Sequence, residues 1–258
     1  KYIWRRSQIQ KPMETDPRNE FVGMESYLFP ETRTLLAEIE SRIHNQVMLR
    51  KVYNSPSTWQ VRKTYPWHID MPERDEGNIV CFTHELLHIY FDFCLGMKLW
   101  DNEVLDLVKP YDRYFKNEWH LANYFVNLIN HLQHHKMIPY FEAYHFPMDK
   151  IVDNYYIFPS QFDTFENNLK AEFDLKQPVH RYSAALSYAN FLCSELFFPN
   201  PEVREEMIRS YSHRMDGKFV GLRSIFEPPF KKWATDFHDL RDLLFEINKL
   251  AKAYAEQE

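Results

Sequence analysis

The chain has 258 residues, a length that suits one large domain or two small ones. Hydrophobic residues make up 45% of it and aromatic residues 17%, which is enough for a sizeable core. The net charge of −6 argues against a nucleic-acid-binding protein, and no apolar run is long enough to cross a membrane. We therefore expect neither nucleic-acid nor membrane partners.

The cysteines indicate a reducing compartment. The chain has three cysteines, Cys81, Cys94 and Cys193. Their number is odd and no two of them form a C-x-x-C motif, so they do not suggest a disulfide framework. We therefore expect a cytoplasmic protein. The sequence also lacks a glycine-rich phosphate-binding loop and the G-x-S-x-G signature of serine hydrolases.

In the first third of the chain, the spacing of apolar residues changes from a helical pattern to the alternating pattern of strands. Residues 1–29 are punctuated by prolines and predict irregular structure. Apolar residues at helical spacing then predict a helix over residues 31–46. Alternating patterns after this helix predict three short strands, and a second helix follows them. The strands are expected over residues 46–54, 58–65 and 67–71, and the helix over residues 79–97.

The rest of the chain predicts helices. One helix leads to Pro110, and a long amphipathic helix covers residues 117–137. Three further helices are expected over residues 179–197, 200–214 and 232–256. The predicted fold class is therefore α+β and helix-rich, with the strands confined to the first third. We divide the chain into a first domain, residues 1–159, and a helical C-terminal region, residues 160–258, packed on it.

The segment CFTHELLHIYFDF, residues 81–93, contains His84, Glu85 and His88 in the order H-E-x-x-H. Histidines four residues apart lie on one helix face, where both imidazoles can reach a single zinc ion. Glu85 points beside the metal, and there it can take a proton from a zinc-bound water. The surrounding apolar side chains make an unpartnered histidine pair costly, which favours a metal site over two ordinary core histidines.

A catalytic zinc site needs a third protein ligand and one open position. Glu118 is the predicted third ligand, because it stands at the start of the apolar stripe of the long helix, where a carboxylate needs a partner. A charge that complements the helix N-terminus is the alternative explanation for a glutamate there. The next candidates for the third ligand are His120 and Glu103.

The segment HELLH after a short strand, with NEWHLAN on a later helix, resembles a minimal gluzincin, a zinc peptidase with H-E-x-x-H and a downstream glutamate. The ImmA/IrrE-type peptidase domain is the nearest resemblance we identify, followed by the M48-type peptidases, and it covers about residues 31–137. The resemblance implies a zincin-like core, made of a helix, a small three-stranded sheet, the metal-binding helix and a glutamate-bearing helix. It also implies a substrate lying along an edge strand, which by position is WHIDM, residues 67–71.

The expected function is that of a zinc-dependent metallohydrolase, a peptidase that cleaves peptide or protein substrates with a zinc-activated water. Zn²⁺ is the expected cofactor, bound by His84, His88 and Glu118, with Glu85 as the catalytic base. The alternative is a non-catalytic or latent zincin-fold protein with a regulatory protein partner, because ImmA/IrrE-like proteins often act in regulation.

Other residues offer weaker alternatives. His131, His134 and His135 suggest a solvated polar face rather than a second metal site. Two E-x-x-H patterns, at Glu85–His88 and Glu142–His145, with Glu118 between them, are also typical of di-iron helical bundles. Pro139 and Pro147 argue against a long helix around the second pattern. The candidates for stabilising a transition state come from later in the chain, and they are His145, Tyr155, Tyr156, His180, Arg181 and Tyr182.

Overall fold

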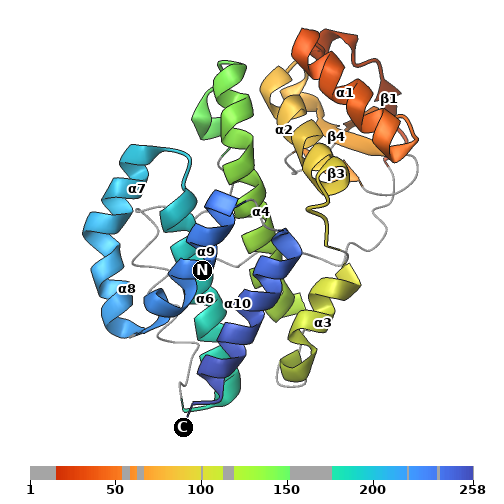
Figure 1. The fold of residues 1–258 in the computed structure, drawn as a ribbon. Coiled ribbons are helices and arrows are strands. Elements are labelled where there is room, and N and C mark those ends of the chain that lie inside the picture. The colour runs from red at the N-terminus through yellow and green to blue at the C-terminus, as the bar shows by residue number, and fades with distance from the viewer. Residues whose placement is uncertain are drawn as a thin grey trace. The chain divides into compact units, whose positions relative to one another are not determined.

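The chain divides into two compact units, residues Lys1–Lys98 and Leu99–Glu258. The computed structural model describes residues 16–53, 59–62, 67–99, 101–112, 119–151, 176–219, 221–236 and 239–257. The boundary predicted between residues 159 and 160 lies outside the described residues and stays a prediction. Helices dominate and one small sheet is present, so the helix-rich α+β class is confirmed (Figure 1).

The first unit contains the sheet and two helices. Helices α1 and α2 lie on one face of the sheet (Figure 1). A short π-helical segment, η3, continues α2 directly. The elements in chain order are β1 (Glu20–Val22), η1 (Glu25–Tyr27), α1 (Pro30–Ile43), β2 (Met48–Val52), β3 (Gln60–Arg62), β4 (His68–Pro72), η2 (Glu73–Asp75), α2 (Ile79–Ile89) and η3 (Tyr90–Cys94).

The sheet has the strand order β1-β2-β4-β3. Strands β2 and β4 run parallel, whereas β1 and β3 pair antiparallel with β2 and β4, respectively. The three strands predicted from the sequence are confirmed. Residues 1–29 were expected to be irregular, and this is wrong for the segment that forms β1 and η1.

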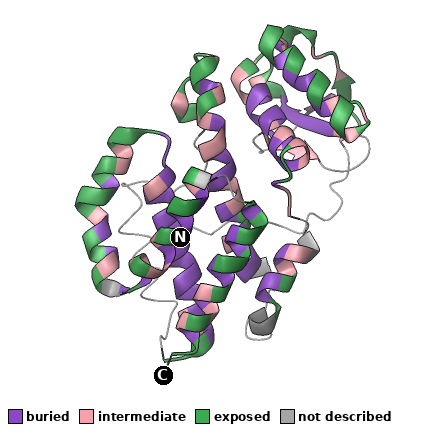
Figure 2. Ribbon diagram, viewed as in Figure 1, coloured by how far each residue is buried: buried purple, intermediate pink, exposed green. Residues whose placement is uncertain are grey.

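The expectation that WHIDM is an edge strand is also wrong. β4 lies between β2 and β3, and all five of its residues are buried (Figure 2). The edges of the sheet are β1 and β3. The reason is topological, because β3 precedes β4 in the chain but pairs on its far side, opposite β2.

An ion-pair cluster explains how an acidic residue can occupy the central strand. Asp70 is 5% exposed, and its two carboxylate oxygens accept hydrogen bonds from Arg50 at 2.8 and 2.9 Å. The Nε atom of Arg62 donates a third bond to Asp70 at 2.8 Å. A buried carboxylate with several charge-assisted bonds is compensated for its lost hydration. The cluster therefore ties β2, β4 and β3 together on one face of the sheet.

The second unit consists of helices. Most residues of α6 are buried, and α4, α9 and α10 pack around this central helix (Figure 2). The elements are α3 (Asp101–Asp112), α4 (Trp119–Ala143), η4 (Met148–Lys150), α6 (Pro178–Phe197), α7 (Pro201–Met207), η6 (Ile208–Ser212), α8 (His213–Lys218), α9 (Leu222–Asp236) and α10 (Leu240–Ala255).

Helices α4 and α9 of this unit contain prolines that lie outside the predicted helices. Helix α4 continues through Pro139 to Ala143, although the predicted helix ends at residue 137. Helix α9 contains Pro228 and Pro229 and was not predicted as a separate helix. Buried aromatic side chains on these helices, such as Phe141 on α4, show that packing outweighs the local cost of proline.

A buried arginine–carboxylate network ties α6, α8 and α9 together. Arg223 donates to both oxygens of Glu195 at 2.9 and 2.8 Å and to Asp216 at 2.7 Å. Tyr188 donates to the other oxygen of Asp216 at 2.5 Å. Burial, followed by this hydrogen bond, raises the pKa of the Tyr188 hydroxyl. The buried carboxylate of Glu195 is thus paired with the partly exposed Arg223.

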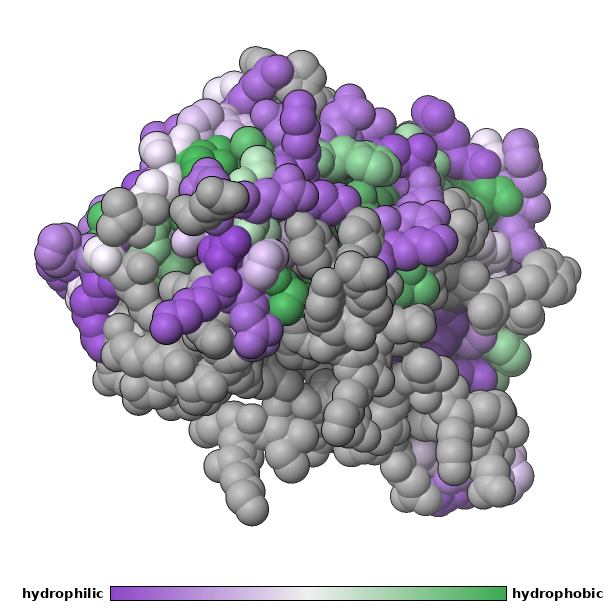
Figure 3. Space-filling model, turned by 90° about the horizontal axis from the view of Figure 1, so that it is seen from below, coloured by the Kyte–Doolittle hydropathy of each residue, from purple (hydrophilic) through white to green (hydrophobic). Residues whose placement is uncertain are grey.

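No described helix combines the length and the apolar character needed to span a bilayer. On the face drawn in Figure 3, the described residues are mostly hydrophilic, with hydrophobic side chains in small separate patches.

His135 links the stability of the second unit to pH. Its ring lies 4.6 Å from that of Phe197 and 6.2 Å from that of Trp233, measured between ring centroids. Burial lowers the pKa of His135 from 6.5 to about 4, and the positive charges of Lys136 and Arg204 act in the same direction. The folded chain therefore resists protonation of this ring.

We predict that His135 makes the protein less stable as the pH falls from about 6.5 to 4. In this window the unfolded chain binds a proton that the folded chain does not, so protonation favours unfolding, by up to ~3 kcal/mol. Denaturant unfolding of wild type and His135→Leu at several pH values measures the effect. Wild type should lose more free energy of unfolding than the variant, and identical pH dependence in the two proteins would contradict the prediction.

Candidate metal centre

Helix α2 carries the predicted motif, and an N-terminal cap and a buried apolar face fix its position within the first unit. The side chain of Asn78 caps its N-terminus by accepting a hydrogen bond from the Cys81 backbone N–H at 3.1 Å. The side chains of Phe82, Leu86, Leu87 and Ile89 are fully buried. Their burial fixes the rotation of the helix about its axis, and so fixes the direction in which the motif residues point.

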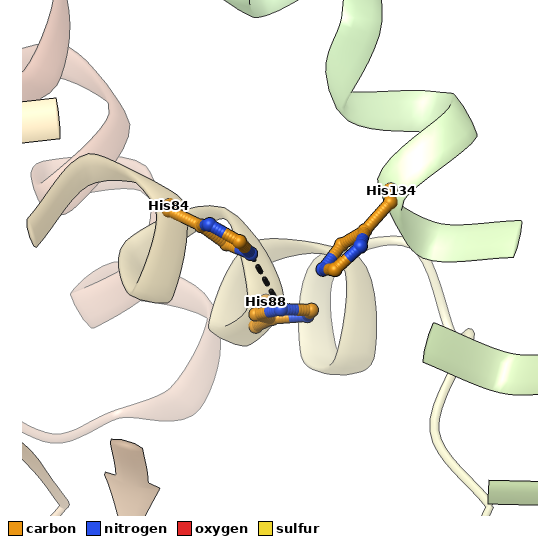
Figure 4. Close-up of side chains that lie close together, drawn as sticks. All are labelled: His84, His88 and His134. Atoms are coloured by element: carbon orange, nitrogen blue, oxygen red, sulfur yellow. Dashed lines mark hydrogen bonds between the residues drawn. The ribbon is translucent and has the colours of Figure 1, made fainter. Parts of the chain in front are cut away.

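His84 and His88 form a close pair on one face of α2. Their Nε2 atoms are 3.0 Å apart, and their ring centroids are 4.9 Å apart (Figure 4). His84 is 9% exposed and His88 is partly exposed. The structure therefore brings together the two histidines of the predicted site with the same ring nitrogen of each directed to one point.

The separation of these nitrogens suits a shared metal ion. Two histidine ligands of a tetrahedral zinc, each at ~2.05 Å, would have their nitrogens about 3.3 Å apart. The observed 3.0 Å is close to this value. The same distance also fits a hydrogen bond in which one neutral imidazole donates to the other. Geometry alone allows both arrangements, so the chemistry of the neighbouring residues must decide between them.

Glu85 lies beside the pair on the same helix. One residue along a helix corresponds to a rotation of ~100°, so Glu85 does not share the direction of His84 and His88. Its side chain is partly exposed. This placement suits a base that works next to a metal-bound water rather than a third metal ligand.

The helix that carries the motif changes its hydrogen bonding after Ile89, the residue that follows His88. Residues Tyr90–Cys94 form the π-helical segment η3, and the Leu95 N–H donates to the Tyr90 carbonyl at 3.2 Å. The segment packs against α1. Short π-helical segments within α-helices are frequent at functional sites. The helix predicted over residues 79–97 is thus confirmed only in part, as α2 followed by η3.

The predicted third ligand is not defined by the structure. Glu118 lies outside the described residues, and so does the side chain of His120. Glu103, the other reserve, forms an ion pair with Arg241 at 2.8 Å. Among the described residues of the first unit, no further histidine, cysteine, aspartate or glutamate completes a three-ligand set with His84 and His88.

The histidine cluster of α4 is not the solvated face expected from the sequence. His131 and His134 are fully buried, and His135 is mostly buried. His134, also labelled in Figure 4, belongs to this helix. The Nδ1 atom of His131 lies 3.5 Å from the hydroxyl of Ser194 on α6. The expectation was wrong because α6 covers this face of α4, which the sequence of α4 alone does not reveal.

The di-iron alternative loses its second motif. Glu142 lies near the end of α4 with an exposed side chain, and His145 is exposed beyond the helix. His145 has a φ of 57°, the left-handed conformation typical of a residue after a helix end. Metal ligands of four-helix carboxylate proteins point into the bundle core, and these two side chains do not.

The residues considered for transition-state stabilisation have separate structural roles or are undefined. Tyr182 is buried and donates a hydrogen bond to Asn248 at 2.6 Å. Arg181 donates to the Ala255 carbonyl at 2.9 and 2.6 Å. Tyr155 and Tyr156 lie outside the described residues, and His180 is partly exposed at the start of α6. Among the described residues of this set, none stands out as a stabilising donor.

The comparisons with known proteins add no family assignment. Searches against protein-family models, curated proteins and solved structures found no match to this chain. The resemblance to zinc peptidases therefore depends on the residues of the H-E-x-x-H helix and on the helix that follows it.

Proposed function

We propose that this protein is a zinc-dependent metallohydrolase, most simply a peptidase, whose centre is built on α2. The observation that carries the proposal is the 3.0 Å approach of the His84 and His88 Nε2 atoms, next to Glu85. Two imidazoles with one adjacent carboxylate are the minimum that a zinc hydrolase requires of its metal-binding helix.

Each residue has a defined role in the proposed reaction. His84 and His88 would hold the metal, which would supply a water of lowered pKa and a Lewis acid for the substrate carbonyl. Glu85 would accept a proton from that water and pass it to the leaving amine. The fully buried side chains of α2, among them Leu86 and Leu87, keep the two imidazoles aligned.

Glu118 remains the proposed third ligand, as the sequence predicts, and it lies outside the described residues. The described residues of the first unit do not supply this ligand, and its remaining residues contain only Glu14 among histidine, cysteine, aspartate and glutamate.

We predict that the purified protein binds about one zinc ion per chain and that His84→Gln and His88→Gln each abolish this binding. Glutamine keeps much of the side-chain volume but is a poor zinc ligand. Metal analysis after dialysis measures the stoichiometry, and His213→Gln, at an exposed position on α8, is the matched control. Zinc that is absent even after soaking, or retained in both variants, would contradict the proposal.

Glu118→Gln tests the predicted third ligand. Loss of this ligand should weaken zinc affinity by at least tenfold, whereas the control His213→Gln should bind like wild type. Circular dichroism checks that each variant is folded. If Glu118→Gln binds zinc as tightly as wild type, the assignment of the third ligand is wrong.

We predict that Glu85→Gln retains zinc but loses at least ~100-fold in peptide hydrolysis, because the amide cannot accept the proton. Turnover of casein and of a quenched peptide library measures activity, and Glu246→Gln, exposed on α10, is the control. Equal turnover by Glu85→Gln and wild type would remove the proposed mechanism. Zinc binding without hydrolysis in wild type would favour the non-catalytic regulatory alternative.

A further inference from the structure

The face of the sheet that points away from α1 and α2 carries polar side chains. On the helix side, the Tyr27 hydroxyl donates a hydrogen bond to the Met71 sulfur at 3.0 Å, and the ring centroids of Tyr27 and Phe82 are 5.4 Å apart. Met71 of β4 therefore points toward α2. Successive side chains of a strand alternate between the two faces of the sheet. His68 and Asp70 of β4 thus point to the face opposite the helices.

Asp70 binds Arg50 by only one edge of its guanidinium group. Arg50 stands directly opposite Asp70 in the register of β2 and β4, so both side chains lie on the same face. The Nε and Nη2 atoms of Arg50 donate to Asp70 at 2.8 and 2.9 Å. A guanidinium has five N–H groups, so the edge formed by Nη1 and Nη2 stays open. Among the described residues, no acceptor meets this second edge, and the Arg50 side chain is 20% exposed.

The charges around the open edge favour an anion. Arg50 and Arg62 bring two positive charges to the single negative charge of Asp70, in a chain whose net charge is −6. Asp70 is 5% exposed and fixes the orientation of both guanidinium groups. An incoming anion would therefore meet an arginine that is already ordered, which lowers the entropic cost of binding. Carboxylates and phosphates match such an edge with two parallel hydrogen bonds.

Phe21 supplies an apolar surface next to the open edge. It stands directly opposite Arg50 in the register of β1 and β2, where Cβ atoms are about 5 Å apart. Its ring centroid lies 5.7 Å from that of His68, and the residue is 48% exposed. A molecule whose anionic group binds Arg50 would thus place its neighbouring atoms on the Phe21 ring.

We infer that Arg50 and Phe21 form a binding site for an anion, a carboxylate or a phosphate, that carries an apolar or aromatic group. The anion takes the Nη1–Nη2 edge of Arg50, and the apolar group packs on Phe21. Asp70 positions the arginine from below. The site lies on the face of the sheet opposite α2, so it is separate from the His84–His88 pair and does not depend on the proposed zinc centre.

Titration of the full chain with small anions tests this site. The probes are phenyl phosphate and benzoate, with benzyl alcohol as the uncharged counterpart. Binding is followed by the NMR signals of the Arg50 Nε–H and the Phe21 ring. Wild type should bind at least one of the two anions saturably and at least tenfold more tightly than benzyl alcohol. The anion that binds more tightly identifies the charged group of the ligand.

Phe21→Glu places a competing carboxylate opposite Arg50 and leaves every member of the ion-pair cluster in place. It should weaken anion binding at least tenfold. Phe245→Glu, at a position on α10 that is 51% exposed, is the matched control and should bind like wild type.

Arg50→Lys keeps a positive charge for Asp70 but has no second edge, so it should weaken binding at least threefold. Circular dichroism checks that each variant is folded. Unchanged affinity in Phe21→Glu, or no saturable shift at Arg50 with either anion, would overturn the inference.

Discussion

The one-turn spacing of an α-helix places His84 and His88 side by side, and the site depends on this spacing. Their Nε2 atoms approach to 3.0 Å only because α2 is regular through His88 and cannot rotate. Phe82, Leu86 and Leu87 prevent that rotation, since turning the helix would expose them to water. The hydrogen bonding of the helix changes only beyond the second histidine, where η3 begins.

Charge compensation supports the scaffold in each unit. Asp70 is held between Arg50 and Arg62 at the centre of the sheet. Glu195 is held by Arg223 in the core of the second unit. Removing the arginine from such a cluster would leave a buried carboxylate without its partner. This loss would lower the free energy of unfolding by more than the intact ion pair contributes to it. Because their charges are compensated, Asp70 and Glu195 can be buried in structural roles, and neither needs a catalytic role to explain its burial.

Local patterns predicted the elements well, but they did not predict what covers them. The three strands and most helices follow from apolar periodicity, and so does the H-E-x-x-H helix. β1 depends on pairing with β2, and the central place of β4 depends on β3, so neither is visible in a short window. The contacts that cover His131 and His135 likewise come from α6, more than 40 residues later in the chain.

The site was predictable to the extent that it is local. His84, Glu85 and His88 lie within five residues, so their mutual geometry follows from helix periodicity. A third ligand needs a residue from a distant segment. Contacts such as that between Trp67 and Phe93 likewise carry no sequence signal, since this one arises where the residue before β4 packs against η3 within one unit.

An anomalous difference map from crystals of the zinc-loaded protein, collected at the zinc absorption edge, tests the central claim most directly. The account predicts one strong peak within bonding distance, ~2.0–2.1 Å, of the Nε2 atoms of both His84 and His88. The same map would show which residue provides the third ligand. A map with no peak at this pair, or with the zinc bound elsewhere and a direct hydrogen bond between the two imidazoles, would contradict it.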